Sequence, residues 1–499
     1  MAENPLPQVN DDSGSDESEE SNGPVLRRLR KISADKSTLP SNRPICSKLS
    51  LPEHIAAYCE KRELIRDDTP ISCDNAIVEK AMSNYIIAKE ILSNLSWQDK
   101  GLCKHVCTTW RSAVNSLVRE HFHLVDFVYN MQRKVFDHDR LIKSNDFHKA
   151  PMAVLVFVNN AGSAMTAYCK DIIPCPCKTP CKAKLHSILD VIHQRLCAPK
   201  DCMFTVVTSF LTFMPLPSSV TYSNVLRHYH KQGSKPFIGG IYIPDIPNVQ
   251  FHVLNIKQKN RNTMDFQDDF YDVLEKLAET RIFKGVLVYA TQYYILQSFE
   301  GITLLNYFKL LQQEIPFALA GCIIEDTILQ QSQIDEMIKG INDGIDYASN
   351  NLISIGVFTI PKNDDGSDNR ENYNFDMFSL VIQKCEWTKP KIQEIINDFA
   401  KKVPHFEHSV ALKLSCIGRD KKHEIEQEYF RVAFPQTPLV GCYGNGEIGI
   451  NHPPRSCSHG QMSKRARQDP LKDMTYSYST VFLYIGWGKI FAEPESPNK

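Results

Sequence analysis

IAKEILSNLSWQDKGLCKHVCTTWRSAVNSL, residues 87–117, predicts two amphipathic helices in succession. In the first helix, apolar residues recur every four positions and therefore share one face. After a break at residues 96–101, a similar spacing continues through a second helix. The periodic positions are Ile87, Ile91 and Leu95 in the first helix and Leu102, Val106, Trp110, Ala113 and Leu117 in the second. Two short helices this apolar cannot bury both faces against each other, so they need the rest of the chain or a partner.

Two motifs in this pair carry a family resemblance, and they read Ile91-Leu92-x-x-Leu95 and Val106-Cys107-x-x-Trp110. Their order and separation resemble those of the F-box family. That family usually opens its first helix with Leu-Pro-x-Glu, which is SNYI at residues 83–86 here. Asn84 or Ser83 can cap the helix in place of the missing proline. Taken alone, the segment is also compatible with an ordinary buried helical hairpin.

An F-box docks its host protein onto the Skp adaptor of a cullin-RING ubiquitin ligase. The resemblance therefore implies a non-catalytic substrate receptor of an SCF-type (Skp-cullin-F-box) ligase, with protein substrates as its other partners. It implies neither a cofactor nor a metal. The adaptor-binding residues expected from the motifs are Ile87, Ile91, Leu92, Leu95, Leu102, Val106 and Trp110.

The bulk composition is that of a folded protein without a strong charge. Hydrophobic residues make up 42% of the 499 and charged residues 23%, which excludes a largely disordered chain. Lys and Arg number 57 against 58 Asp and Glu, so no excess charge favours a nucleic acid or a membrane surface. No run is apolar enough to span a bilayer, and the acidic N-terminus is unlike a signal peptide. The 16 cysteines are therefore expected as free thiols, in the cytoplasm and nucleus.

The first 75 residues are predicted to form a disordered tail, because they are poor in apolar residues and rich in Ser, Asp and Glu. Ser13, Ser15 and Ser18 precede carboxylates, which is the context that acid-directed kinases favour. A purely solubilising tail is equally compatible with this composition. Basic clusters at residues 27–31 and 464–467 could act in nuclear import or could simply be solvated.

From about residue 150 the sequence predicts an α+β body. Apolar runs rich in β-branched and aromatic residues occur at 153–158, 203–211, 237–243, 285–290, 317–324, 352–360, 409–418, 437–444 and 478–488. Helical spacing appears at 266–280 and 391–401 and in a third segment, residues 304–311, that precedes Pro316. Many strands carry polar residues at alternate positions and helices are few. Mixed or antiparallel sheets are therefore expected, in place of a doubly wound parallel sheet.

Two patches in this body resemble the C-terminal half of a FIST domain. LSCIGR at 414–419 is a strand that runs into a turn, and residues 434–449 contain the run GNGEIG. The motif residues are Cys416, Gly418, Arg419, Gly444, Asn445, Gly446, Glu447 and Gly449. The combined resemblance implies an F-box at 76–130, the N-terminal part of a FIST domain at 150–300 and its C-terminal part at 301–499.

FIST domains resemble small-ligand sensors, with amino acids as proposed ligands. On that resemblance, Arg419 could hold a carboxylate and Glu447 an amine. Alternatively, both charges satisfy turn backbone or pair with each other. The alternative function is therefore a ligand sensor whose F-box-like helices are only structural.

Two further motifs are candidates for chemical sites. Gly444-x-Gly446-x-x-Gly449 matches a dinucleotide fingerprint, but the prolines at 453–454 prevent the helix that such a site needs. Asn445-Gly446 predicts instead a tight hairpin turn. The cluster at Cys175–Cys181 could bind zinc, or it could be an exposed loop with redox-reactive thiols. A hydrolase or metalloenzyme built on this cluster has no supporting motif.

Overall fold

The computed structural model describes the following residues: 79–80, 82–129, 141–145, 147–159, 162, 166–168, 185–187, 203–209, 238–257, 265–292, 300–324, 351–362, 374–383, 385–386, 388–455 and 474–491. The chain divides into two units, and all of these residues belong to the second, residues 52–499. The predicted tail at 1–75 with its three serines, the Cys175–Cys181 cluster and both basic clusters lie outside the described residues. Those predictions therefore stay predictions.

The predicted helical pair is a set of three helices: α3 (Tyr85–Ser93), α4 (Trp97–Cys103) and α5 (Thr108–Glu120). The expected cap is confirmed, because the Asn84 side chain accepts the backbone N–H groups of residues 86 and 87. Ser96 caps α4 in the same way, through the backbone N–H of Asp99. A single second helix through residues 102–117 is wrong. Cys107 has extended backbone, its sulfur accepts the N–H of Trp110, and Val106 lies in the linker between α4 and α5.

The three helices share a small core of their own. It consists of Ala88, Leu92, Trp110, Ala113, Val114 and Leu117, all buried. The indole Nε1 of Trp110 also donates to the carbonyl oxygen of Met82 at 2.9 Å, which fixes the chain entering α3. The segment therefore gains its stability from one face of α3 packed on one face of α5.

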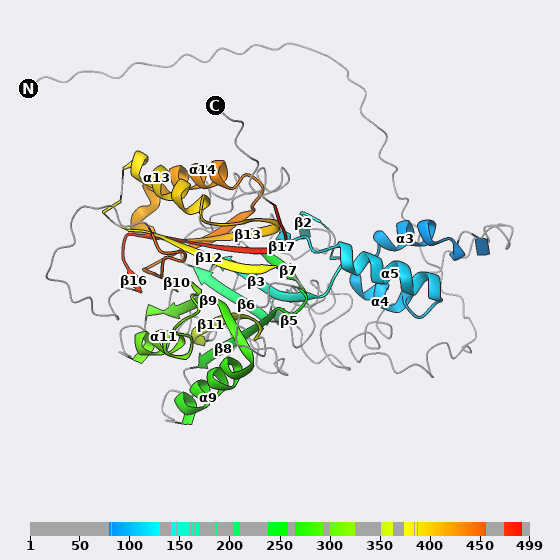
Figure 1. Ribbon diagram of the computed structural model, residues 1–499, viewed down its shortest axis with the longest axis horizontal. Coiled ribbons are helices and arrows are strands. Elements are labelled where there is room, and N and C mark those ends of the chain that lie inside the picture. The colour runs from blue at the N-terminus through cyan, green and yellow to red at the C-terminus, as the bar shows by residue number, and fades with distance from the viewer. Residues whose placement is uncertain are drawn as a thin grey trace, which may run out of the picture. The chain divides into compact units, whose positions relative to one another are not determined.

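The remainder of the described chain forms three larger sheets (Figure 1). The five-stranded sheet has the order β2 (Leu141–Lys143), β1 (Val125–Tyr129), β7 (Ile238–Pro244), β3 (Pro151–Asn159) and β6 (Met203–Ser209). The six-stranded sheet has the order β16 (Thr475–Tyr476), β15 (Glu447–Gly449), β10 (Ala318–Ile324), β9 (Arg281–Thr291), β11 (Asn351–Pro361) and β8 (Gln250–Lys257). The four-stranded sheet has the order β12 (Phe375–Ile382), β17 (Thr480–Phe491), β13 (His405–Cys416) and β14 (Leu439–Gly444). A small pair joins β4 (Thr166–Tyr168) and β5 (Leu185–Ser187).

Each of the three larger sheets mixes strand directions, which confirms the predicted α+β class with mixed sheets. The pairs β3–β6, β9–β10 and β13–β14 are parallel, and the other described pairs of these sheets are antiparallel. Every predicted β-rich run contains a strand, and the three predicted helices of the body are present as α9 (Asp265–Thr280), α11 (Glu300–Leu311) and α13 (Lys389–Ala400).

Helices cover the outer faces of two sheets. α13 and α14 (His423–Ala433) pack on the four-stranded sheet, where Ile392, Ile396 and Phe430 meet Phe482 (Figure 1). α9 and α11 pack on the six-stranded sheet through Phe270 and Phe308. A third core lies between the sheets, and its buried residues come from all three of them. The described part of the body is therefore layered around its sheets.

The expected hairpin at Asn445-Gly446 is wrong. β14 belongs to the four-stranded sheet and β15 to the six-stranded sheet, so the strands on either side do not pair with each other. Asn445 N–H donates to the carbonyl oxygen of Ile323, and Ile323 N–H donates to that of Gly446, each at 2.8 Å. Residues 444–446 are thus a crossing from the four-stranded to the six-stranded sheet, and these two hydrogen bonds hold it against β10. No helix follows Gly449 in residues 450–455, as expected from the prolines.

We expect Gly444→Ala to lower the free energy of unfolding by roughly 1–3 kcal/mol, because the crossing leaves no room for a side chain. A Cβ at this position would lie 2.8 Å from the Cβ of Cys322 and 2.9 Å from the carbonyl oxygen of Ile323. Denaturant unfolding measures the change. Val432→Ala, at an exposed position on α14, is the control and should leave the midpoint unchanged. Equal midpoints for Gly444→Ala and the native chain would contradict this crossing.

Candidate functional site

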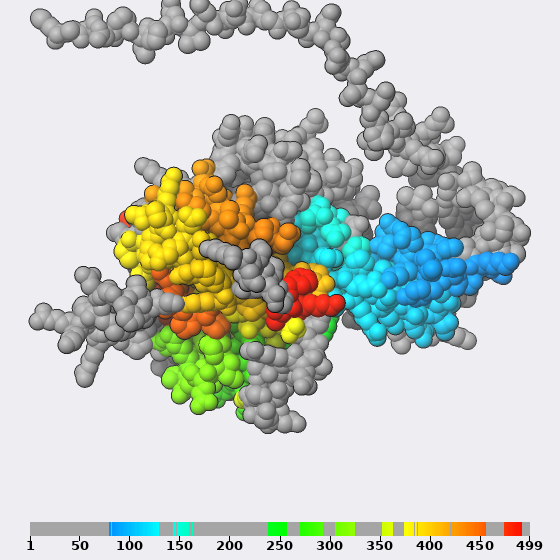
Figure 2. All heavy atoms as spheres, turned by 45° about the horizontal axis from the view of Figure 1, so that its top comes forward, coloured from blue at the N-terminus to red at the C-terminus, as the bar shows by residue number. Residues whose placement is uncertain are grey.

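The helical segment, residues 82–120, exposes several large apolar side chains to solvent. Ile87 and Ile91 are each 42% exposed and Val106 is 61% exposed. Three neighbours in the sequence of α3 and just before it are exposed as well: Met82, Tyr85 and Ile86. Figure 2 shows the atoms of α3 in blue at the surface of the molecule. Apolar side chains gathered in one short segment are typical of a protein-binding surface.

The structure divides the seven predicted adaptor-binding residues by burial. Leu92 and Trp110 are buried in the helical core, and Leu95 and Leu102 are half-buried. Ile87, Ile91 and Val106 are exposed. The stripe of apolar residues four apart is therefore not the stripe that faces α5. Ala88 and Leu92, one position along, form the buried face, and Ile87 and Ile91 lie beside it.

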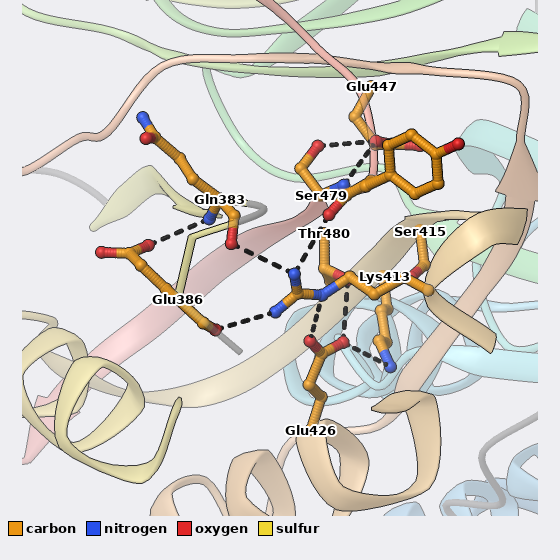
Figure 3. A network of polar contacts seen from close by, with 10 residues as sticks. Gln383, Glu386, Lys413, Ser415, Glu426, Glu447, Ser479 and Thr480 are labelled. Atoms are coloured by element: carbon orange, nitrogen blue, oxygen red, sulfur yellow. Dashed lines mark hydrogen bonds and ion pairs between the residues drawn. The ribbon is translucent and has the colours of Figure 1, made fainter. Parts of the chain in front are cut away.

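The FIST-like motif residues lie in a second place, a buried network of charges at the end of β13. Arg419 is fully buried on the short 3-10 turn η5 (Ile417–Lys422). Its Nε donates to Glu426 Oε1 at 2.6 Å. Its terminal nitrogens donate to the backbone carbonyl oxygens of Gln383, Tyr478 and Glu386 at 3.1–3.2 Å (Figure 3). Arg419 is therefore engaged by the protein's own backbone and by one carboxylate.

Glu426, which the sequence reasoning missed, is the centre of this network. Its Oε2 lies 3.1 Å from Lys413 Nζ and accepts from the Thr480 hydroxyl at 2.8 Å. Burial alone would raise the pKa of Glu426, but Lys413, Arg419 and the hydroxyl together hold it below its ordinary value. Burial lowers the pKa of Lys413, and Glu426 opposes that change. The signal in the sequence was Lys413, a lysine that lies between two leucines in the apolar run VALKL at 410–414.

Glu447 is also buried, but no cation binds it directly. Its Oε2 accepts from the backbone N–H and the hydroxyl of Ser479, at 3.2 and 2.6 Å, as Figure 3 shows. Its Oε1 has no hydrogen-bond partner among the described residues. Burial raises the pKa of Glu447 to about 8, so the group is a neutral carboxylic acid at neutral pH. Burial and this neighbour also raise the pKa of the Cys416 thiol.

These contacts give Arg419 and Glu447 internal roles. A ligand carboxylate would have to compete with Glu426 and three carbonyl groups for Arg419, and a protonated Glu447 offers no charge to an amine. The other motif residues serve close packing. A Cβ on Gly418 would lie 2.5 Å from the Tyr478 ring, and one on Gly449 would lie 3.0 Å from Val481. The ligand pocket implied by the FIST resemblance stays a prediction.

Two other kinds of site receive no support from the described part of the chain. Within it, no group of three or more His, Cys, Asp or Glu side chains is placed to hold a metal ion. The described helices include none that is both long and apolar enough to cross a membrane.

Comparison with known proteins supports an F-box-like region at most. No family model matches the chain. F-box only protein 22 from Pongo abelii is 29% identical over 87 residues, and that from Homo sapiens is 31% identical over 88 residues. Each match covers 16% of this chain and 21% of the relative, so the chain spans about a fifth of the length of these curated relatives. The similarity supports an F-box-like region and leaves the FIST domain unsupported.

Similarity to solved structures is too weak to carry an argument. Cyanuric acid hydrolase from A. caulinodans superposes with a TM-score of 0.27 at 7% identity, covering 67% of this chain and 91% of that one. A second cyanuric acid hydrolase structure gives a TM-score of 0.28 at 7% identity, covering 73% of this chain and 100% of that one.

We expect Glu447→Gln to flatten the pH dependence of the free energy of unfolding. Between the ordinary carboxyl pKa of 4.5 and the folded-state pKa of about 8, the folded chain holds a proton that the unfolded chain releases. This carboxyl therefore lowers the stability of the native chain progressively as pH rises through that window, and the effect levels off above it. Glutamine cannot ionise and still offers an acceptor to Ser479. Denaturant unfolding at about pH 5.5, 7 and 8.5 should show native and variant curves that diverge, and parallel curves would contradict the burial of a neutral acid.

Proposed function

We propose that the chain is a substrate receptor of an SCF-type ubiquitin ligase, in which helices α3–α5 dock the Skp adaptor and the FIST-like body binds the target. The observation that carries the proposal is the exposure of Ile91 and Val106, inside the two F-box-like motifs, and of Ile87 one turn before the first motif. The partial similarity to F-box only protein 22 supports the helical part of the proposal. Selection of the target by the body rests on the motif resemblance at 414–419 and 434–449 alone.

The division of the motif residues suits a docking module. Leu92 and Trp110 hold the three helices together without help from a partner. Ile87 and Ile91 stand on the adjacent face of α3, and Val106 stands on the linker before α5. Burying side chains of this size against another protein contributes roughly 1.5–3 kcal/mol each where burial is complete. A groove that accepts an apolar helix face is a common mode of such recognition.

In this role the chain performs no bond chemistry. It holds a protein target near a ubiquitin-conjugating enzyme on the same assembly, which raises the effective concentration of target lysines. The engagement of Arg419 and Glu447 in internal bonds agrees with a body that recognises its partner from the surface. We also propose that the chain acts in the cytoplasm and nucleus, where thiols stay reduced.

We expect the double substitution Ile87→Asp/Ile91→Asp to weaken binding of the Skp adaptor by more than about a hundredfold, since two apolar contacts are replaced by desolvated charges. Its melting temperature should stay close to that of the native chain, because both side chains are exposed. Leu310→Asp, at a 62% exposed position on α11, is the matched control and should bind normally. Titration of the purified full chain with the adaptor measures the affinity. Undiminished binding by the double variant would defeat the proposal.

Leu92→Ala should give the opposite pattern. This fully buried side chain packs in the helical core, so its truncation should lower the stability of the helical segment by roughly 2–5 kcal/mol. The apparent affinity for the adaptor should then fall as the unfolded fraction of the segment rises. It should recover when the sample is cooled toward the temperature of maximum stability. Helical content near residues 85–120, followed by hydrogen exchange, measures the first effect. Loss of affinity with the helices fully protected would mean that Leu92 itself contacts the adaptor.

A further inference from the structure

Four histidines lie in a row where the helical segment meets the sheets. His121 caps the C-terminus of α5, and His123 follows it in the chain. His148 lies three residues before the start of β3, and His408 lies on β13. The ring of His121 stacks on that of His148 with centroids 4.3 Å apart. The ring of His123 lies edge-on to that of His408 at 4.8 Å, and His121 and His123 are 6.5 Å apart. We call these four the junction histidines.

Lysines face this row at close range. Lys100 on α4 is buried, and its Nζ lies 2.6 Å from His148 Nδ1. With Lys100 as an ammonium donor, His148 accepts at Nδ1 and its ring is neutral. Lys149 is buried beside it, with Nζ 3.7 Å from the centre of the Phe122 ring. Burial lowers the pKa of Lys149 to about 8.

Burial and neighbouring cations outweigh the carboxylates near the row. The carboxylates of Glu120 and Glu407 favour protonation of His121 and His408, but the pKa values of both histidines are lowered. The titratable groups that face His121 are Lys89, Lys100, Glu120, His123 and His148. His408 faces His123 and Glu407. Lys149 faces Asp245. Glu407 lies 3.9 Å from His408, too far for a strong hydrogen bond.

Two backbone contacts show that the row lies at a connection. The indole Nε1 of Trp487 on β17 donates to the carbonyl oxygen of Phe122 at 2.9 Å. The backbone N–H of Trp97, at the start of α4, donates to the carbonyl oxygen of Phe147 at 3.0 Å. Residues 121–124 and 147–149 therefore bond both to the helices and to the strands, and the junction histidines lie within or against both segments.

We propose that the junction histidines make this connection acid-sensitive, so that it is closed while the rings of His121, His148 and His408 are neutral and loosens when these rings take up protons. A proton on Nδ1 of His148 would remove one acceptor of Lys100 and place two positive charges 2.6 Å apart. A proton on His121 would add a third charge against the same stacked ring. This inference goes beyond the proposed function and does not depend on adaptor binding.

The direction of the pH effect follows from the lowered values. Burial is the largest cause that lowers the pKa of His121 and of His408, and neighbouring cationic or imidazole groups add to it. The loosened state has histidines near their ordinary pKa of 6.5. The closed connection is therefore fully favoured above pH 6.5 and loses that advantage as pH falls through the lowered values.

Hydrogen exchange of the full chain, followed by mass spectrometry at about pH 7.5 and about pH 5.5 and corrected for intrinsic exchange, tests the proposal. In acid, the native chain should lose protection about tenfold or more at residues 121–124 and 147–150. The reason is that each proton bound only in the loosened state changes the opening equilibrium by about tenfold per pH unit. β9 and β17 should keep theirs. His148→Gln, which still accepts from Lys100 but cannot become charged, should keep neutral-pH protection and lose clearly less in acid. Equal protection of the native junction at both pH values would overturn the proposal, as would equal acid loss in native chain and variant.

A matched control separates the junction from histidine burial in general. His252 lies half-buried on β8, and burial lowers its pKa too, but it contacts Thr359 of the same sheet. His252→Gln should show the full acid loss at the junction. If His148→Gln loses junction protection already at about pH 7.5, His408→Gln replaces it as the test variant, with the same expectation. Acid loss of equal size in β9 and β17 would indicate global unfolding and would also overturn the proposal.

Discussion

The buried carboxylate of Glu426 is the charge on which the arrangement of the C-terminal sheet depends. It receives Arg419 Nε at 2.6 Å and Lys413 Nζ at 3.1 Å, together with the Thr480 hydroxyl. These groups come from α14, η5, β13 and β17, so one side chain ties a helix to the two central strands beneath it. A buried carboxylate that loses its cations costs roughly 3–5 kcal/mol. The helix, the turn and the strands must therefore dock together.

The same bonds decide what the FIST-like motif does in this chain. Once Glu426 orients the guanidinium of Arg419, the remaining donors reach the carbonyl groups of Gln383, Glu386 and Tyr478. Tyr478 has a φ of 54°, a backbone conformation that is strained for an aromatic residue and needs support from its surroundings. Arg419 holds its carbonyl group, Glu447 holds the next residue, and Gly418 leaves space for its ring. In this chain the motif builds a turn.

Local sequence predicted the elements well and their partners poorly. Runs such as 352–360 are apolar and β-branched whatever they pair with, so strands there were predictable. Asn445-Gly446 has the local chemistry of a hairpin, but its hydrogen bonds go to Ile323, more than a hundred residues earlier. The break at Cys107 was missed because apolar spacing continues across it and a cysteine is an unusual helix cap. Glu426 was missed because its function exists only through the distant Lys413 and Arg419.

The F-box-like helices show why periodicity alone could not separate buried from exposed apolar residues. Both kinds must be apolar, and Ile87, Ala88, Ile91 and Leu92 fall on neighbouring strips of one helix. Which strip is buried depends on where α5 lies, and that is set by Trp110, whose indole bonds to the carbonyl oxygen of Met82. With Ala88 facing α5 the helices approach closely, and the larger isoleucines are left outside. A small residue on the inner strip thus leaves the bulkier apolar side chains at the surface.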